Sequence, residues 1–96
     1  MPTVDDSILA RRPCHDRSTA SRVFGNEAVI ISPAENMVRM LDEVGARIWQ
    51  LADGTRTVDE ISATLMVEYD VAPAEATTSA AEFIELLVDK GLLAWV

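Results

Sequence analysis

A second cysteine, a long apolar run and an amino-terminal secretory segment are all missing from this chain of 96 residues. With Cys14 alone, no internal disulfide can form. The longest apolar stretches fall far short of the roughly 20 residues that a bilayer-spanning helix needs. The chain opens on polar residues of mixed charge, which is not typical of a signal peptide. We therefore expect a cytoplasmic protein that has no membrane partner.

Motifs for catalysis are also missing. The sequence has no glycine-rich phosphate loop, no metal-ligand spacing and no serine-type triad. Cys14 and His15 are neighbours, but no second cluster of ligands accompanies them. We expect no catalytic residue, no metal site and no cofactor, and hence a protein that is not an enzyme.

Positive charge is scarce and unevenly placed. The chain has eight lysines and arginines and sixteen acidic residues, which gives a net charge of −8. Residues 1–22 hold four arginines against three aspartates, a balance of +1, and residues 23–96 hold four basic against thirteen acidic residues, a balance of −9. Nucleic-acid affinity depends on basic side chains. We therefore expect no nucleic-acid partner, and a neutral or basic peptide or protein suits the chain better.

Strand signals occupy the first half of the chain. The stretch "SRVFGNEAVIIS" contains two β-rich runs on either side of Gly25 and Asn26, a pair that favours a hairpin turn. Residues 32–36, "SPAEN", predict a second turn because Pro33 blocks continuation of the strand. The next run, Met37 to Leu41, predicts a third strand.

Helix signals occupy the second half. Asp42 is a candidate N-cap for a helix that starts at Glu43 and stops near Gly54. Thr57 and Glu60 have the spacing of a capping box and predict the start of a second helix. A third helix is expected from Pro73 to a stop at Gly91. The last residues, "LLAWV", predict a short strand or a packed tail.

This order of elements predicts an α+β fold, with a three-stranded antiparallel sheet followed by three helices that cover one face of it. Residues 1–18 show no sustained period and contain two prolines, so we expect a flexible N-terminal arm there. Residues 19–96 form the expected domain. In a meander the third strand keeps one free edge.

The segment from Met37 to Val71, with the helix that follows it, resembles the PqqD-like family. These proteins are RiPP recognition elements, small domains used in the biosynthesis of ribosomally made, modified peptides. The resemblance covers about residues 20–93. It rests on the pair Leu41-Asp42, on Ala46, Ile48 and Trp49 in the first helix, on the loop Asp53-Gly54-Thr55-Arg56-Thr57, and on Ile61, Leu65 and Tyr69 in the second helix.

The resemblance implies a winged-helix-like fold and a non-catalytic adaptor. Family members bind the leader of a precursor peptide as an added strand along the third strand, with leader side chains in the groove beside the third helix. They present the precursor to a modifying enzyme, in one case a radical S-adenosylmethionine enzyme. Carried onto this chain, the implied peptide-binding residues are Met37, Val38, Arg39, Met40 and Leu41 on the strand and Ala80, Phe83, Ile84 and Leu87 on the helix.

Several alternatives stay open at this point. Met37 and Met40 are also ordinary core residues for a strand, and alternation alone does not say which face of that strand meets the helices. A winged-helix DNA-binding regulator has the same element order, although the third helix is acidic. Edge strands also pair with themselves, so the chain is expected to be a monomer or a weak homodimer. The chain resembles pyrroloquinoline quinone chaperones, and it equally resembles recognition elements of other pathways, so the resemblance does not decide between them.

Overall fold

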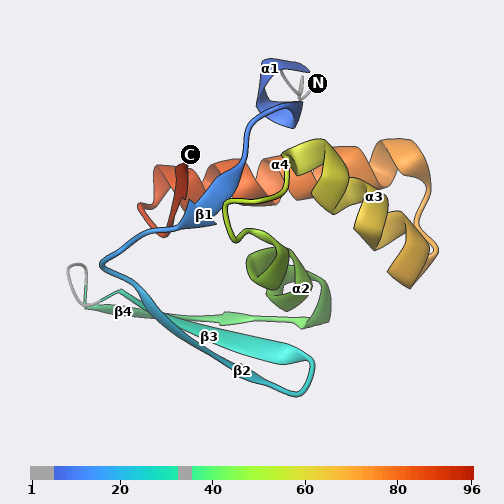
Figure 1. Ribbon diagram of the computed structural model, residues 1–96. Coiled ribbons are helices and arrows are strands. Elements are labelled where there is room, and N and C mark those ends of the chain that lie inside the picture. Colours follow the sequence, from blue (N-terminus) through green and yellow to red (C-terminus); the bar gives the residue numbers. More distant parts are fainter. Residues whose placement is uncertain (1–5, 33–35) are drawn as a thin grey trace.

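Apart from a short first helix and a short last strand, strands make up the first part of the chain and helices the second, as Figure 1 shows for the computed structural model of the chain. The structure describes residues 6–32 and 36–96. The elements, in chain order, are α1 (Asp6–Leu9), β1 (Pro13–His15), β2 (Ala20–Phe24), β3 (Glu27–Ser32), β4 (Met37–Leu41), α2 (Glu43–Leu51), α3 (Val58–Tyr69), α4 (Pro73–Asp89) and β5 (Leu93–Trp95).

The main sheet is the predicted antiparallel meander, with strand order β2-β3-β4. A two-residue turn joins β2 to β3, since Phe24 pairs with Glu27. Gly25 takes a φ of +56° in this turn, a value that glycine adopts without steric cost. The second predicted turn, at residues 32–36, lies largely outside the described residues, because 33–35 are not among them.

One face of the sheet packs against the helices. Along β3 the side chains alternate: Ala28 and Ile30 are almost fully buried, whereas Ile31 is 43% exposed. Figure 1 shows the sheet under α2, with α3 and α4 beyond α2. Trp49 on α2 is 1% exposed and lies in the core between these layers. The α+β, three-stranded arrangement expected from the sequence is confirmed.

The predicted helix caps are present. The amide of Gly45 donates to Asp42 Oδ1 at 2.9 Å at the start of α2. In the capping box of α3, the Glu60 amide donates to Thr57 Oγ1 at 3.1 Å and the Thr57 amide donates to Glu60 Oε1 at 2.8 Å. Caps of this kind contribute about 0.5–2 kcal/mol each. They set where the helices begin, and so fix α2 directly after β4.

The N-terminal segment corrects the sequence interpretation of a flexible arm over residues 1–18. Residues 1–5 lie outside the described part, but β1 pairs antiparallel with β5 and Pro13 is fully buried. Backbone groups of the segment also accept hydrogen bonds from the Gly54 amide (to Pro13 O, 2.9 Å) and the Val58 amide (to Arg11 O, 3.0 Å). The segment thus satisfies one amide of the loop between α2 and α3 and the first amide of α3, and these bonds hold it in place without any apolar period.

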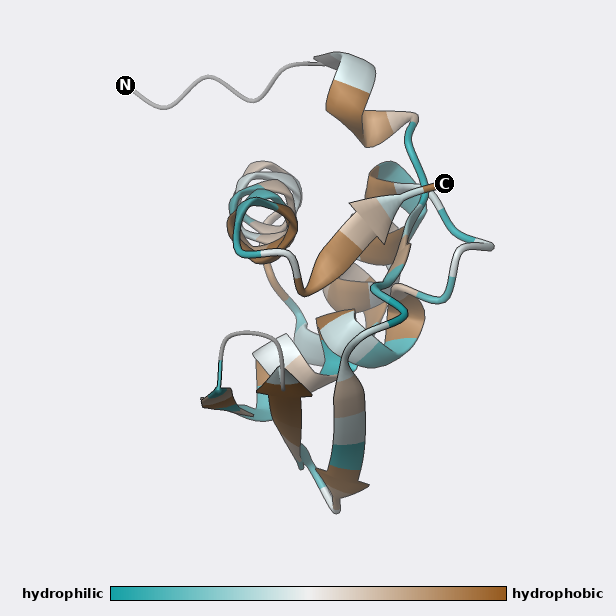
Figure 2. Ribbon diagram, turned by 90° about the vertical axis from the view of Figure 1, so that its left-hand side faces the viewer, coloured by the Kyte–Doolittle hydropathy of each residue, from teal (hydrophilic) through white to brown (hydrophobic). Residues whose placement is uncertain are grey.

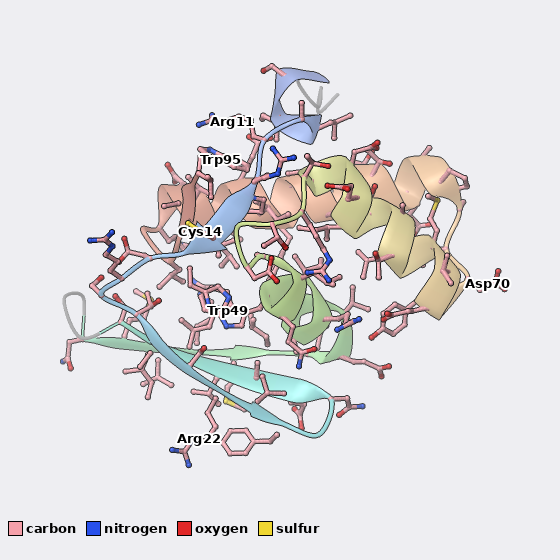
Figure 3. The ribbon with its side chains drawn as sticks, in the orientation of Figure 1. Arg11, Cys14, Arg22, Trp49, Asp70 and Trp95 are labelled. Atoms are coloured by element: carbon pink, nitrogen blue, oxygen red, sulfur yellow. The ribbon has the colours of Figure 1, made fainter. Side chains whose placement is uncertain are left out.

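Two aromatic contacts attach this segment to the domain (Figure 3). The His15 ring stacks on Trp49 with centroids 3.8 Å apart and planes 11° apart. A 2.7 Å hydrogen bond joins His15 Nε2 to the backbone oxygen of Trp49. Arg11 lies over the ring of Trp95, 4.6 Å from its centroid. The segment therefore closes the core at Trp49.

Deleting residues 1–18 is expected to lower the free energy of unfolding by about 2–4 kcal/mol, because several backbone bonds that contribute about 0.5–1.5 kcal/mol each are lost. Urea unfolding followed by tryptophan fluorescence measures the change. His15→Ala should account for about 1 kcal/mol of it through the lost stacking and hydrogen bond.

Arg17→Ala, at an exposed neighbouring position, is the control and should shift the unfolding free energy by no more than about 0.5 kcal/mol. An unchanged unfolding midpoint for the deletion would show that the pairing of β1 with β5 contributes nothing to stability.

Candidate functional site

The free edge of β4 is the first component of the candidate site. β4 pairs with β3 in the register Ala28 to Leu41, Ile30 to Arg39 and Ser32 to Met37. Among the described residues no strand pairs with its other edge. In an antiparallel pair, every second residue directs its N–H and C=O groups to the neighbouring strand, and the residues between direct theirs away.

The turn at Gly25 and Asn26 decides which residues of β4 face outward. The residues that flank a two-residue hairpin turn form a hydrogen-bonded pair, here Phe24 and Glu27. Alternation then turns the backbone groups of Ala28 and Ile30 toward β4, where they meet Leu41 and Arg39. The free backbone groups of β4 are consequently those of Val38 and Met40.

The side chains of β4 divide between the two faces of the sheet. Val38 is 65% exposed and Met40 64% exposed on the outer face, where Arg22 also projects away from the helices in Figure 3. Leu41 is 5% exposed and Arg39 is half-buried on the inner face. This answers the question that alternation left open: Met37, Arg39 and Leu41 are on the side of the helices.

Nothing on β4 blocks an added strand. Edge strands are usually protected by proline, lysine or a bulge. β4 has no proline and a single charged residue, and Figure 2 shows that the sheet strands carry strongly apolar stretches. The described chain therefore exposes a short, apolar edge with four free backbone groups.

A recess between α2 and α4 is the second component. The α2–α4 recess is lined by six residues that follow the end of β4 or lie on the two helices: Asp42, Val44, Gly45, Ile48, Ser79 and Phe83. Gly45 allows Phe83 to lie close to α2, because a Cβ atom at that position would meet Phe83 Cζ and Asp42 Oδ1 at 3.2 Å each. A peptide that runs along β4 and passes Leu41 would reach this recess.

A second recess continues from the first, sharing Val44 and Ser79 and adding Leu65, Tyr69, Val71, Glu75 and Ala76. Burial raises the pKa of Tyr69 above its ordinary value, and the carboxylates of Glu43 and Glu68 raise it further. The phenol therefore stays protonated at neutral pH and keeps its hydrogen-bond donor. This part of the surface is mainly apolar, with one carboxylate at Glu75.

The helix residues expected at the site are not all at the surface. Ala80, Ile84 and Leu87 are fully buried in the core. Phe83 is half-buried and lines the α2–α4 recess. The sequence reasoning missed Asp42, Val44, Gly45 and Ser79 as lining residues; a glycine inside a helical pattern was the signal for Gly45, because it marks close approach of another element.

The side chains that could act as metal ligands are scattered over the described residues. These residues contain no group of three or more His, Cys, Asp or Glu side chains that could hold a metal ion. His15 is engaged with Trp49, and Cys14, the residue before it on β1, has its Cβ close to Gly54. Across residues 6–32 and 36–96, no helix combines the length and the apolar character of a membrane span. The edge and its two recesses suit the binding of an extended chain.

A family profile and a solved structure both point to the PqqD family. A family profile described as coenzyme PQQ synthesis protein D (PqqD) matches residues 27–93. The solved structure of TbiB1 in complex with the TbiA(beta) leader peptide is 26% identical, with a TM-score of 0.77, and the match covers 83% of this chain and 93% of that one. No curated protein matches the chain.

Two further structures share the fold. One is the PqqD truncation of Methylobacterium extorquens PqqCD, described as a stand-alone RiPP recognition element; it is 26% identical with a TM-score of 0.69, covering 85% of this chain and 87% of that one. The other is a lasso peptide synthetase B1 complexed with its leader peptide, 16% identical with a TM-score of 0.77, covering 86% and 98%. At 16% identity, the likeness to the lasso peptide synthetase B1 shows the fold alone.

Amide hydrogen exchange tests the assignment of the free edge. The amides of Val38 and Met40 should exchange roughly tenfold or more faster than those of Arg39 and Leu41, because only the latter are bonded to β3. Two-dimensional NMR of the labelled protein in deuterated buffer measures all four. The opposite order would mean that Arg39 and Leu41 supply the free groups.

Proposed function

The chain belongs to the PqqD family, and on that premise we propose that it is a non-catalytic adaptor for a ribosomally made precursor peptide. It captures the leader segment of the precursor as an added β-strand on β4 and presents the rest of the precursor to a modifying enzyme. The observation that supports this most directly is the unpaired edge of Val38 and Met40, which leads into the α2–α4 recess.

The other edge of the sheet, β2, is the weaker candidate. All five of its residues are exposed, and its register leaves the backbone groups of Ser21 and Val23 free. The recess near its turn is lined largely by polar groups, among them Asn26, Glu43, Arg47 and Gln50. An added strand on β2 would meet the exposed side chains of Val23 and Phe24 but not the α2–α4 recess, whereas β4 leads into that recess, which Val44 and Phe83 line.

The energetics of docking on β4 are sufficient for a reversible complex. Four backbone hydrogen bonds contribute about 2–6 kcal/mol in total. Two or three apolar leader side chains contribute about 1.5–3 kcal/mol each when buried. Association itself costs about 4 kcal/mol or more. The sum favours a binding free energy of about −8 kcal/mol, which corresponds to a dissociation constant near micromolar. Such an affinity lets the leader leave once modification is complete.

DNA binding fits the described surface poorly. α4, the counterpart of a recognition helix, carries Glu75, Glu82, Glu85 and Asp89 and no basic residue between Pro73 and Asp89. Such a helix repels the phosphates that flank the major groove. The proposed role is in peptide maturation in the cytoplasm, where ribosomal peptides are made, with a partner enzyme of the radical S-adenosylmethionine type as the first candidate.

Val38→Pro should abolish docking and leave the fold intact, because proline removes an amide that faces away from β3 and is tolerated at a free edge. The probe is a 16-residue peptide selected for binding to the wild-type protein from a displayed random library. We expect its affinity to fall by about tenfold or more with the variant. Fluorescence anisotropy measures the affinity.

Ser21→Pro is the matched control, since it removes the equivalent outward amide from β2 and should leave affinity unchanged. Bound peptide should also slow exchange at the Val38 and Met40 amides. Loss of binding with Ser21→Pro alone would move the site to β2, and NMR shifts caused only by duplex DNA would contradict the adaptor. Protection of the same two amides that rises with protein concentration in the absence of peptide would instead indicate dimerisation through β4.

A further inference from the structure

Arg39 lies in the middle of the proposed docking edge and has an unsatisfied polar group. Its Nε atom is buried and has no hydrogen-bond partner among the described residues. Two other arginines of the domain are compensated: Arg47 pairs with Glu68 at 2.8 Å and Arg56 with Asp53 at 2.9 Å. A buried donor without an acceptor is costly and needs an explanation.

The register of β4 brings a peptide side chain next to Arg39. A strand added to the free groups of Val38 and Met40 has one residue between those two anchor points, opposite Arg39. Side chains of directly opposed residues lie on the same face of a sheet, in either strand direction. The peptide residue opposite Arg39 therefore points to the inner face, where the guanidinium group lies.

We propose that Arg39 selects leader peptides that carry Asp or Glu at the residue opposite it, with apolar residues two positions away on each side. This inference rests on the proposed function. A carboxylate supplies acceptors that match the planar donor fork of arginine and forms charge-assisted bonds. Apolar residues at the flanking positions would lie opposite Met37 and Leu41, and the second of these is adjacent to the α2–α4 recess.

The acidic residues near the end of β4 would make the position of this peptide carboxylate decide how the peptide aligns with the strand. Asp42 and Glu43 follow β4 directly, and Glu75 lines the second recess. An acidic peptide residue two positions along, at the end of β4, would meet like charge. Opposite Arg39 it meets the single positive side chain of the strand. Attraction at one position and repulsion beyond it would fix the peptide in one alignment.

The test compares peptides selected from a displayed library of random 16-residue sequences against the wild-type protein and against Arg39→Met. The methionine variant keeps an unbranched stem of similar length and removes the charge. Wild-type binders should be enriched in Asp or Glu at one position with apolar residues two places on each side. Binders of the variant should lose that enrichment. Arg22→Met, on the outer face of β2, is the control and should keep it.

A double-mutant cycle on one wild-type-selected peptide sharpens the test. Replacing its acidic residue by the matching amide should weaken wild-type binding by about tenfold or more and Arg39→Met binding by less than about threefold. Arg39→Lys, which keeps the charge without the fork, should give an intermediate loss and serves in place of Arg39→Met if that variant unfolds. Calorimetry measures the affinities, and urea unfolding checks each fold.

The outcomes separate this inference from the proposed function. Selected peptides that protect the Val38 and Met40 amides but show no acidic position would overturn the role of Arg39 and leave the adaptor standing. The role of Arg39 would also be overturned, and the adaptor left standing, if replacing the acidic peptide residue by its amide weakened binding equally to the wild type and to Arg39→Met. Peptides that bind without protecting those amides would overturn the docking edge, and with it the role of Arg39.

Discussion

The two-residue turn at Gly25 and Asn26 is the constraint on which the rest of the sheet depends. Because the side-chain and hydrogen-bond patterns of a strand both repeat every two residues, the closing pair of this turn fixes the parity of all three strands. It places Ala28 and Ile30 in the core and leaves Ile31 exposed. It also determines that Val38 and Met40 carry the free backbone groups.

The core and the docking edge are joined by α2. Asp42 caps this helix directly after Leu41, so the last residue of β4 and the first turn of α2 are held in one geometry. Trp49, in the last turns of the same helix, is covered on one side by His15 of β1. The short N-terminal strand therefore stabilises the helix whose first turn forms the wall of the recess. The stability of the fold and the proposed binding are linked through this one element.

The sequence predicted the elements whose signals are local. The turn at Gly25, the cap at Asp42 and the box of Thr57 and Glu60 each depend on a few neighbouring residues, and all are present. β1 was missed because its pairing joins residues about 80 positions apart and each strand has three residues. A strand that short leaves no period to detect.

The proposed binding residues also divide into those that local sequence signals predict and those that depend on how the helices pack. Met37 to Leu41 were located as a strand with a free edge, and the structure places them there. The structure buries the side chains of Ala80, Ile84 and Leu87 in the core, since a helical apolar stripe marks the side that is buried and does not separate core from groove. Gly45 and Ser79 line the recess through the approach of α2 to α4, which only the packed structure reveals.

An apolar edge that is open to a peptide is also open to a second copy of the chain, and Arg39 bears on that conflict. If two β4 strands paired antiparallel through the free groups of Val38 and Met40, the two-fold axis would pass through Arg39, placing it opposite its own copy. Like charges directly opposed on one face of a sheet are destabilising, and the net charge of −8 adds repulsion between copies. A peptide with a carboxylate at the same position would replace that repulsion by attraction. In the proposed complex, one side chain would therefore favour the peptide over the homodimer at an edge that carries no protecting residue.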